Sequence, residues 1–157
     1  MERTLLIIKP DAVQRGLIGK VISRFEEKGL KIAGLKLMKL VREKAEELYA
    51  PHKGKPFFEP TVNFMTSSPL VAMVLEGRMA INLVRTIIGA TRPEEGSPGT
   101  IRGDFSTSVQ LNIVHASDSI ENAERELAIF FDKNEILDYS IISEIWNGNK
   151  MEAGVRT

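Results

Sequence analysis

Four short apolar runs, separated by segments with helical periodicity, constrain the fold of this chain more than any other feature of its sequence. The runs cover residues 4–9, 31–41, 70–75 and 111–115, and Pro10 stops the first of them. Runs of this length that are rich in Leu, Ile and Val and bounded by turn residues are typical of β-strands. We therefore predict four strands.

Between the strands, apolar residues recur at the spacing of an amphipathic helix. This spacing predicts helices that start at Ile18 and end at Gly29, and others over residues 43–50, 58–66 and 79–88. A last helix is expected to begin near residues 117–119, where Asp118 and Glu121 form a capping-box pattern.

The resulting order, β-α-β-α-α-β-α-β-α, is typical of an α/β (α+β) ferredoxin-like sandwich. We expect a four-stranded antiparallel sheet covered by helices that pack on one of its faces. The chain has 157 residues, with no internal repeat and no linker composition. Residues 1–157 are therefore expected to form a single domain with one buried core.

Charge and cysteine content exclude several classes of function. Lys plus Arg equals Asp plus Glu at 21 each, so no overall field attracts nucleic acid or an anionic membrane, and neither partner is expected. The absence of cysteine excludes disulfides, thiolate metal sites and thiol nucleophiles. No apolar stretch approaches the roughly 20 residues of a membrane span. We expect a cytoplasmic protein.

The segment from about residue 90 to 110 does not fit a compact domain. It has no apolar period, and it contains several glycines and prolines together with Arg92, Arg102 and Asp104. Long loops of this kind are usually functional or disordered, and glycine and arginine suit the binding of phosphate. An insertion or a subunit-contact loop explains the composition equally well.

Of the two histidines, His115 is the better candidate for chemistry. His52 lies in a polar stretch and is expected on the surface, whereas His115 ends an apolar strand just before a helix. The helix start favours an anion nearby, and Glu126 lies at the rim of the following helix. A carboxylate that binds one imidazole nitrogen leaves the other as a nucleophile. A solvated Glu126 and a structural His115 remain the alternatives.

The common phosphate-binding motifs are missing. The chain has no GxxxxGK[ST] loop, no GxGxxG and no protein-kinase signature. The two histidines are far apart and no carboxylates cluster in the sequence, so a metal site built from protein ligands alone is not expected. A metal that arrives with a phosphate ligand remains compatible with the sequence.

Three motifs together resemble the nucleoside diphosphate kinase family. They are TLLIIKPDAVQRG at residues 4–16, RGDF at 102–105 and NIVHASDS at 112–119. The resemblance is collinear and covers about residues 3–146. RGDF alone is weak, but the ordered set that ends in N-x-x-H-x-S-D is highly specific. Ala116 stands where many members have glycine, Thr61 where many have leucine, and residues 147–157 match weakly.

The resemblance implies an enzyme that transfers the γ-phosphate of a nucleoside triphosphate to a nucleoside diphosphate. His115 would carry the phosphate in a ping-pong mechanism with broad base specificity. The residues implied in catalysis are His115, Lys9, Glu126, Ser117 and Tyr49. The residues implied in nucleotide binding are Lys9, Phe57 (stacked on the base), Arg85, Thr91, Arg102 and Asn112 (on the ribose 3′-hydroxyl).

The resemblance also implies Mg²⁺ carried by the nucleotide phosphates, with no direct protein ligand and with Asp118 near the water shell of the metal. It implies a homo-oligomer, with a hexamer favoured over a tetramer. The alternative function is a non-catalytic nucleotide- or RNA-binding module of ferredoxin-like fold. Such modules stack bases on aromatic residues of the central strands, which are aliphatic here.

Asn112 and His115 pose a geometric problem. They are an odd number of residues apart, so a regular strand would point their side chains to opposite faces of the sheet. Both are expected to touch one nucleotide. We therefore predict an irregular backbone near Ile113.

Overall fold

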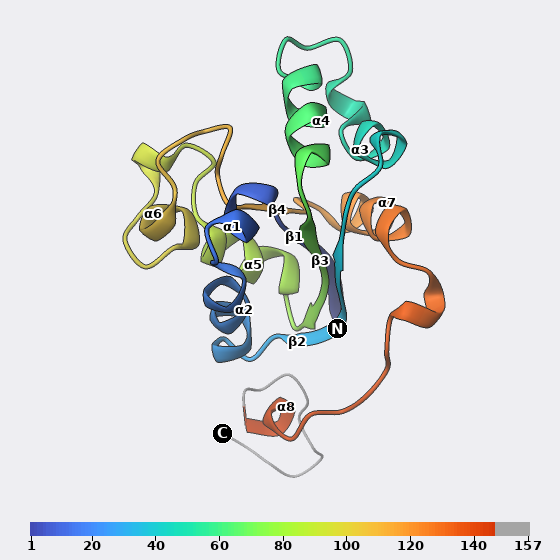
Figure 1. Ribbon diagram of the computed structural model, residues 1–157. Helices are drawn as coiled ribbons and strands as arrows, with labels where there is room; N and C mark the ends of the chain where they lie inside the picture. The colour runs from blue at the N-terminus through green and yellow to red at the C-terminus, as the bar shows by residue number, and fades with distance from the viewer. Residues whose placement is uncertain (147–157) are drawn as a thin grey trace.

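The computed structural model describes residues 1–146, and a four-stranded antiparallel sheet lies at its centre (Figure 1). The strands are β1 (Glu2–Ile8), β2 (Lys31–Met38), β3 (Leu70–Gly77) and β4 (Val114–Ala116), in the order β2-β3-β1-β4. Every neighbouring pair is antiparallel. The predicted ferredoxin-like sandwich is confirmed.

Helices cover both faces of the sheet (Figure 1), so the expectation of a single covered face is wrong. Alternate residues of β1 pack into two separate cores: Leu6 and Ile8 belong to one, and Leu5 and Ile7 to the other. All eight residues of β3 are buried. An unbroken apolar strand needs cover on both sides, since successive side chains point to opposite faces.

The helices divide between the two cores. On the first face lie α1 (Pro10–Gln14), α2 (Ile18–Glu27), α5 (Ala80–Ile88) and α6 (Ile101–Phe105). On the second face lie α3 (Arg42–Leu48), α4 (Phe58–Ser67) and α7 (Ile120–Phe130). Three short 3-10 turns, η1 (Ala50–His52), η2 (Pro93–Glu95) and η3 (Lys133–Glu135), and a short α8 (Ser143–Trp146) complete the described chain.

Three details differ from the sequence predictions. Helix α1 lies between the first predicted strand and the first predicted helix, where no helix was predicted, and it starts with Pro10 at its first position, where no N–H is needed. Strand β4 is shorter than predicted and begins only at Val114. Ser119, and not Asp118, caps α7, because its side chain accepts the N–H of Asn122.

The segment over residues 90–110 is folded and fastened to the first helical face. It contains η2 and α6, and Thr100 caps α6 by accepting the N–H of Gly103. Arg24 of α2 donates to the carbonyl of Gly99 and to the carboxylate of Asp104. The glycines of this segment therefore serve close packing and turns within a defined structure.

Residues 147–157, which matched the family weakly, lie outside the described residues. Among the described helices, none is long and apolar enough to cross a membrane.

Two phenylalanines provide a matched test of the second core. Phe130 is 1% exposed and Phe57 is 48% exposed. We expect Phe130→Ala to lower the free energy of unfolding by about 3–5 kcal/mol, since it leaves a cavity among packed helices and strands. Phe57→Ala should cost less than about 1 kcal/mol. Urea denaturation measures both, and equal losses would contradict the assignment of the core.

Candidate active site

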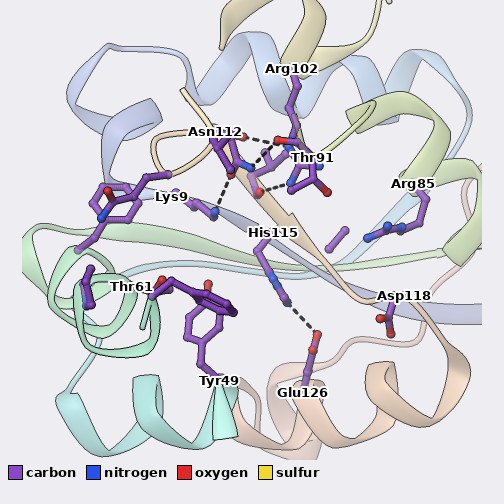
Figure 2. A pocket seen from close by; sticks show the side chains of 17 residues that line it. Lys9, Tyr49, Thr61, Arg85, Thr91, Arg102, Asn112, His115, Asp118 and Glu126 are labelled. Atoms are coloured by element: carbon purple, nitrogen blue, oxygen red, sulfur yellow. Dashed lines mark hydrogen bonds and ion pairs between the residues drawn. The ribbon is translucent and has the colours of Figure 1, made fainter. Parts of the chain in front are cut away.

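A cleft of about 650 Å³ opens above β4, between α4 and the segment that contains η2 and α6. Figure 2 shows Lys9, Asn112, Thr91 and Arg102 on one side of His115, and Tyr49 and Glu126 on the other. Every site residue predicted from the sequence lines this cleft, except Ser117, which lies buried behind Glu126. These residues are Lys9, Tyr49, Phe57, Arg85, Thr91, Arg102, Asn112, His115, Asp118 and Glu126.

The predicted irregularity lies at Ile113. Its φ angle is 73°, in the left-handed region that β-branched residues rarely adopt, and the N–H of Val114 donates to the carbonyl of Asn112 at 2.8 Å. These two features define a γ-turn with positive φ, which is rare and strained. Because the turn breaks the strand alternation, Asn112 and His115 both line the cleft.

His115 is oriented from behind by two residues. Its Nε2 lies 3.0 Å from Oε2 of Glu126, and the Ser117 hydroxyl donates to the same oxygen at 2.6 Å. Burial alone would raise the pKa of Glu126, but these hydrogen bonds hold it below its ordinary value. An ionised carboxylate can only accept, so the proton lies on Nε2 and the lone pair of a neutral ring on Nδ1.

The ring of Tyr49 also packs against the imidazole. The two rings meet edge to face, with centroids 5.9 Å apart. The tyrosine hydroxyl is buried and has no hydrogen-bond partner among the described residues. Burial raises the pKa of this phenol well above its ordinary value, and the charge of Glu126 adds to the effect. Tyr49 is therefore a neutral donor that can bind a ligand oxygen.

A polar network joins the opposite wall of the cleft. The Lys9 ammonium donates to Oδ1 of Asn112 at 2.6 Å, and the Asn112 amide donates to the carbonyl of Thr91. Arg102 donates to the carbonyls of Gly89, Asn112 and Val114. Hydrogen bonds to the protein's own groups thus fix the positions of the charged ends of Lys9 and Arg102.

These two cations lack an ion-pair partner among the described residues. Burial, and then the neighbouring Arg102, lower the pKa of Lys9 to about 8, although Asp11 opposes this shift. Burial and the nearby Arg85 lower the pKa of Arg102 to about 10. A cleft that concentrates uncompensated positive charge is suited to an anionic ligand such as a polyphosphate.

The mouth of the cleft is apolar and aromatic. Phe57 at the N-cap of α4 and Thr61 and Phe64 within that helix recur at helical spacing and line the cleft, and Val109 and Gln110 line it as well. Phe57 is half exposed, and the imidazole of His52 packs against its ring. Such a mouth offers a stacking surface for a planar base.

Sequence reasoning missed three residues of this mouth. Phe64 follows Phe57 by seven residues, so helical spacing could have placed both rings on the same side. Val109 and Gln110 carry no such signal, because they lie in an irregular segment just before Asn112. Asp11 also went unassigned, although its carboxylate accepts the N–H of Ile113 at 3.1 Å.

The described residues offer no cage for a metal ion. No group of three or more His, Asp or Glu side chains in residues 1–146 is arranged to hold one. Glu126 is occupied by His115 and Ser117, which leaves Asp118 as the other carboxylate in the cleft. Asp118 is exposed, and a hydrogen bond from the Asn122 amide helps to keep its pKa below the ordinary value.

Known proteins similar to this chain are nucleoside diphosphate kinases. The model of that family matches residues 2–136. The enzyme of Staphylothermus marinus is 60% identical over 138 residues, which are 88% of this chain and 98% of that protein. The enzyme of Archaeoglobus fulgidus is 55% identical over 146 residues, or 93% of this chain and 97% of that protein.

Solved structures that are similar to this chain are nucleoside diphosphate kinases as well. A halophilic nucleoside diphosphate kinase from Halobacterium salinarum, in complex with CDP, superposes with a TM-score of 0.91 at 47% identity and covers 93% of this chain and 97% of its own. The nucleoside diphosphate kinase of Aquifex aeolicus has a TM-score of 0.84 at 47% identity, with 87% and 99% of the two chains covered.

The buried charge of Lys9 should destabilise the ligand-free protein. Lys9→Met removes the charge and keeps most of the apolar stem. At pH 7 we expect the free energy of unfolding to rise by about 1–3 kcal/mol, because a pKa lowered from 10.5 to about 8 corresponds to about 3 kcal/mol.

The difference in unfolding free energy between Lys9→Met and the wild type should depend on pH. Below about pH 8, Lys9 is charged in both the folded and unfolded states, so the advantage of Lys9→Met is full. Above about pH 8 only the unfolded state keeps the proton, so the wild type gains stability and the difference closes towards pH 10.5. Urea denaturation at pH 7 and pH 10 measures this, with exposed Lys20→Met as the control. A loss of stability in Lys9→Met at pH 7 would contradict the prediction.

Proposed function

The chain belongs to the nucleoside diphosphate kinase family, and from that premise we propose that His115 carries the phosphate in its reaction. The protein is a phosphotransferase that moves the terminal phosphate of a nucleoside triphosphate to a nucleoside diphosphate. The alternative of a non-catalytic binding module is not favoured. The orientation of His115 by Glu126, at 3.0 Å, is the observation that carries the proposal.

Transfer through His115 takes place in two steps. Nδ1 uses its lone pair to attack the γ-phosphorus of the bound triphosphate, and the bond from that phosphorus to the bridging β–γ oxygen breaks. The bond electrons leave with the nucleoside diphosphate. In the second step, a terminal oxygen of another diphosphate attacks the phosphohistidine, and the P–N bond electrons return to Nδ1. One site therefore serves both nucleotides in turn, which gives ping-pong kinetics.

Glu126 and Ser117 support both steps without touching the phosphate. As the ring gives up its lone pair it becomes positive, and the ionised carboxylate at Nε2 stabilises that charge. Ser117 fixes the carboxylate in turn. Their roles are to set the tautomer and the direction of the ring.

The remaining residues position the nucleotide. Lys9, Arg85, Thr91 and Arg102 would bind the phosphates, and Tyr49 would donate to an oxygen near His115. Asn112 would bind the ribose 3′-hydroxyl and Phe57 would stack on the base. A loose phosphoryl transition state gains most from such fixed charges and in-line placement. Arg102 and Lys9 suit this role because hydrogen bonds already hold them in place.

Mg²⁺ fits this cleft as a companion of the phosphates. Residues 1–146 provide no three-carboxylate site, whereas exposed Asp118 lies in the cleft and can bind a water of the metal. When bound, the ion would neutralise phosphate charge and hold the β- and γ-phosphates in one conformation. We propose that it arrives with the nucleotide and leaves with it.

The mouth of the cleft supports broad base specificity. Stacking on Phe57 requires a planar ring but no particular hydrogen-bonding edge, so several bases can bind. The similar enzyme from Halobacterium salinarum was solved with CDP. We propose that this chain accepts both pyrimidine and purine nucleotides.

We further propose a cytoplasmic homo-oligomer, with a hexamer favoured over a tetramer. The supporting feature is β2, one of the two edge strands of the sheet, on which Leu35 and Leu37 are 50% and 64% exposed. Natural proteins seldom leave an apolar edge strand uncovered. The lack of cysteine suits a reducing compartment.

Labelling tests the phosphohistidine. The full chain is incubated with γ-labelled ATP and Mg²⁺ without an acceptor. We expect acid-labile, base-stable label on the wild type and none on His115→Ala, because Nδ1 of His115 is the nucleophile. ADP, GDP, CDP and UDP should each discharge the label, and EDTA should prevent its formation.

His52→Ala is the control for that experiment, since His52 is the only other histidine and should leave the stoichiometry of labelling unchanged. Folded wild-type protein that takes no label would contradict the proposal. Discharge by a single diphosphate would contradict broad specificity.

Sedimentation tests the oligomer. We expect the wild type to sediment with six times the mass of one chain. Leu37→Glu should lower that mass, because it buries a charge in the proposed contact, while Lys39→Glu just beyond β2 serves as a charge-change control. A monomeric wild type would contradict the proposal.

A further inference from the structure

The turn at Ile113 is held from two directions. Its N–H donates to Oδ2 of Asp11 at 3.1 Å, and its carbonyl accepts the N–H of Lys9 at 2.8 Å. A fully buried isoleucine at a φ of 73° is strained, so its surroundings must supply the conformation. The partners are residues 9 and 11, at the end of β1 and the start of α1.

Of these two contacts, only the one from Asp11 is made by a side chain. The Lys9 contact continues the pairing of β1 with β4 and involves backbone alone. Asp11 occupies the first turn of α1, where Pro10 fixes the start of the helix, and its other oxygen, Oδ1, is buried without a hydrogen-bond partner among the described residues. Burying a carboxylate oxygen without a hydrogen-bond partner costs folding free energy, which indicates that the position of Asp11 has a function.

We propose that Asp11 is a positioning residue for phosphoryl transfer: by accepting the N–H of Ile113, it holds the γ-turn that brings Asn112 and His115 to the same nucleotide. Asp11 is not among the residues that line the cleft, and it acts through the backbone. The inference rests on the proposed function, in which Asn112 binds the ribose 3′-hydroxyl and His115 the γ-phosphate.

The hydrogen bond from the Ile113 N–H to Asp11, which we call the clamp, has a specific consequence. Asn112 immediately precedes the turn and His115 follows it by two residues, so relaxation at Ile113 changes the distance and direction between their side chains. The Lys9 ammonium and the Thr91 carbonyl contact the side chain of Asn112, and neither of these two contacts involves the backbone of Ile113. Loss of the clamp should therefore affect the contact with the ribose hydroxyl more than the phosphate contacts.

Two substrates separate this role from general structural support. ATP carries the 3′-hydroxyl that Asn112 would bind, and 3′-deoxyATP lacks it. The second-order rate constant for labelling of His115 is measured with each substrate, for the full chain and its variants. We expect Asp11→Ala to lower the rate constant with ATP at least tenfold and the rate constant with 3′-deoxyATP less than threefold.

A conservative replacement should restore labelling. Asp11→Asn keeps an oxygen that can accept the N–H of Ile113, so its rate constant with ATP should lie within about threefold of the wild-type value. Asp132→Asn is a matched control, because the Asp132 carboxylate also accepts a backbone N–H, in η3 and outside the cleft. It should leave both rate constants unchanged. If Asp11→Ala does not fold, Asp11→Ser replaces it, since its side chain is too short to make the contact.

The outcomes are separable. An Asp11→Ala or Asp11→Ser variant that labels with ATP within twofold of the wild type overturns the inference. So does an equal loss with ATP and 3′-deoxyATP, which would indicate a general effect on folding or on phosphate binding. Failure of the wild type itself to take label on His115 would instead overturn the proposed function.

Discussion

Uncompensated positive charge in a half-buried cleft is the constraint on which the rest of this structure depends. Lys9 and Arg102 have no ion-pair partner among the described residues, and burial lowers the pKa of each. Holding them there costs folding free energy, which hydrogen bonds to Asn112 and to backbone carbonyls partly offset. Such local destabilisation is typical of sites whose ligand completes the charge balance.

The fold supplies that site by bringing chain segments together at one end of the sheet. β1 delivers Lys9 at its end, and β4 delivers His115 beside it. Helix α7 returns over the second face, where Glu126 reaches His115, and the segment with η2 and α6 closes the first face over Asn112. Because helices cover both faces, each half of the cleft rests on a different core.

Much of this could be predicted from sequence, and the exceptions have physical reasons. Strands and long helices carry strong periodic signals. The odd spacing of Asn112 and His115, together with the expectation from the family resemblance that both touch one nucleotide, predicted the irregular turn at Ile113. The expectation of one covered face failed because it overlooked that an unbroken apolar run such as residues 70–75 needs cover on both faces of the sheet. Ser119 rather than Asp118 caps α7, since adjacent capping residues compete and only geometry decides. Asp11 was missed because its contact spans 102 positions.

Arg102 illustrates why residues in such a site resist assignment to a single role. A guanidinium has five N–H donors, and Arg102 uses one on each nitrogen to bind the carbonyls of Gly89, Asn112 and Val114. Two of these carbonyls flank the strained turn at Ile113, so the side chain that we propose for phosphate binding also holds the backbone between Asn112 and His115. A lysine would keep the charge but could not reproduce this planar set of contacts. Loss of Arg102 would therefore combine loss of the proposed phosphate contact with release of the turn, whereas Asp11, which does not line the cleft, reports on the turn alone.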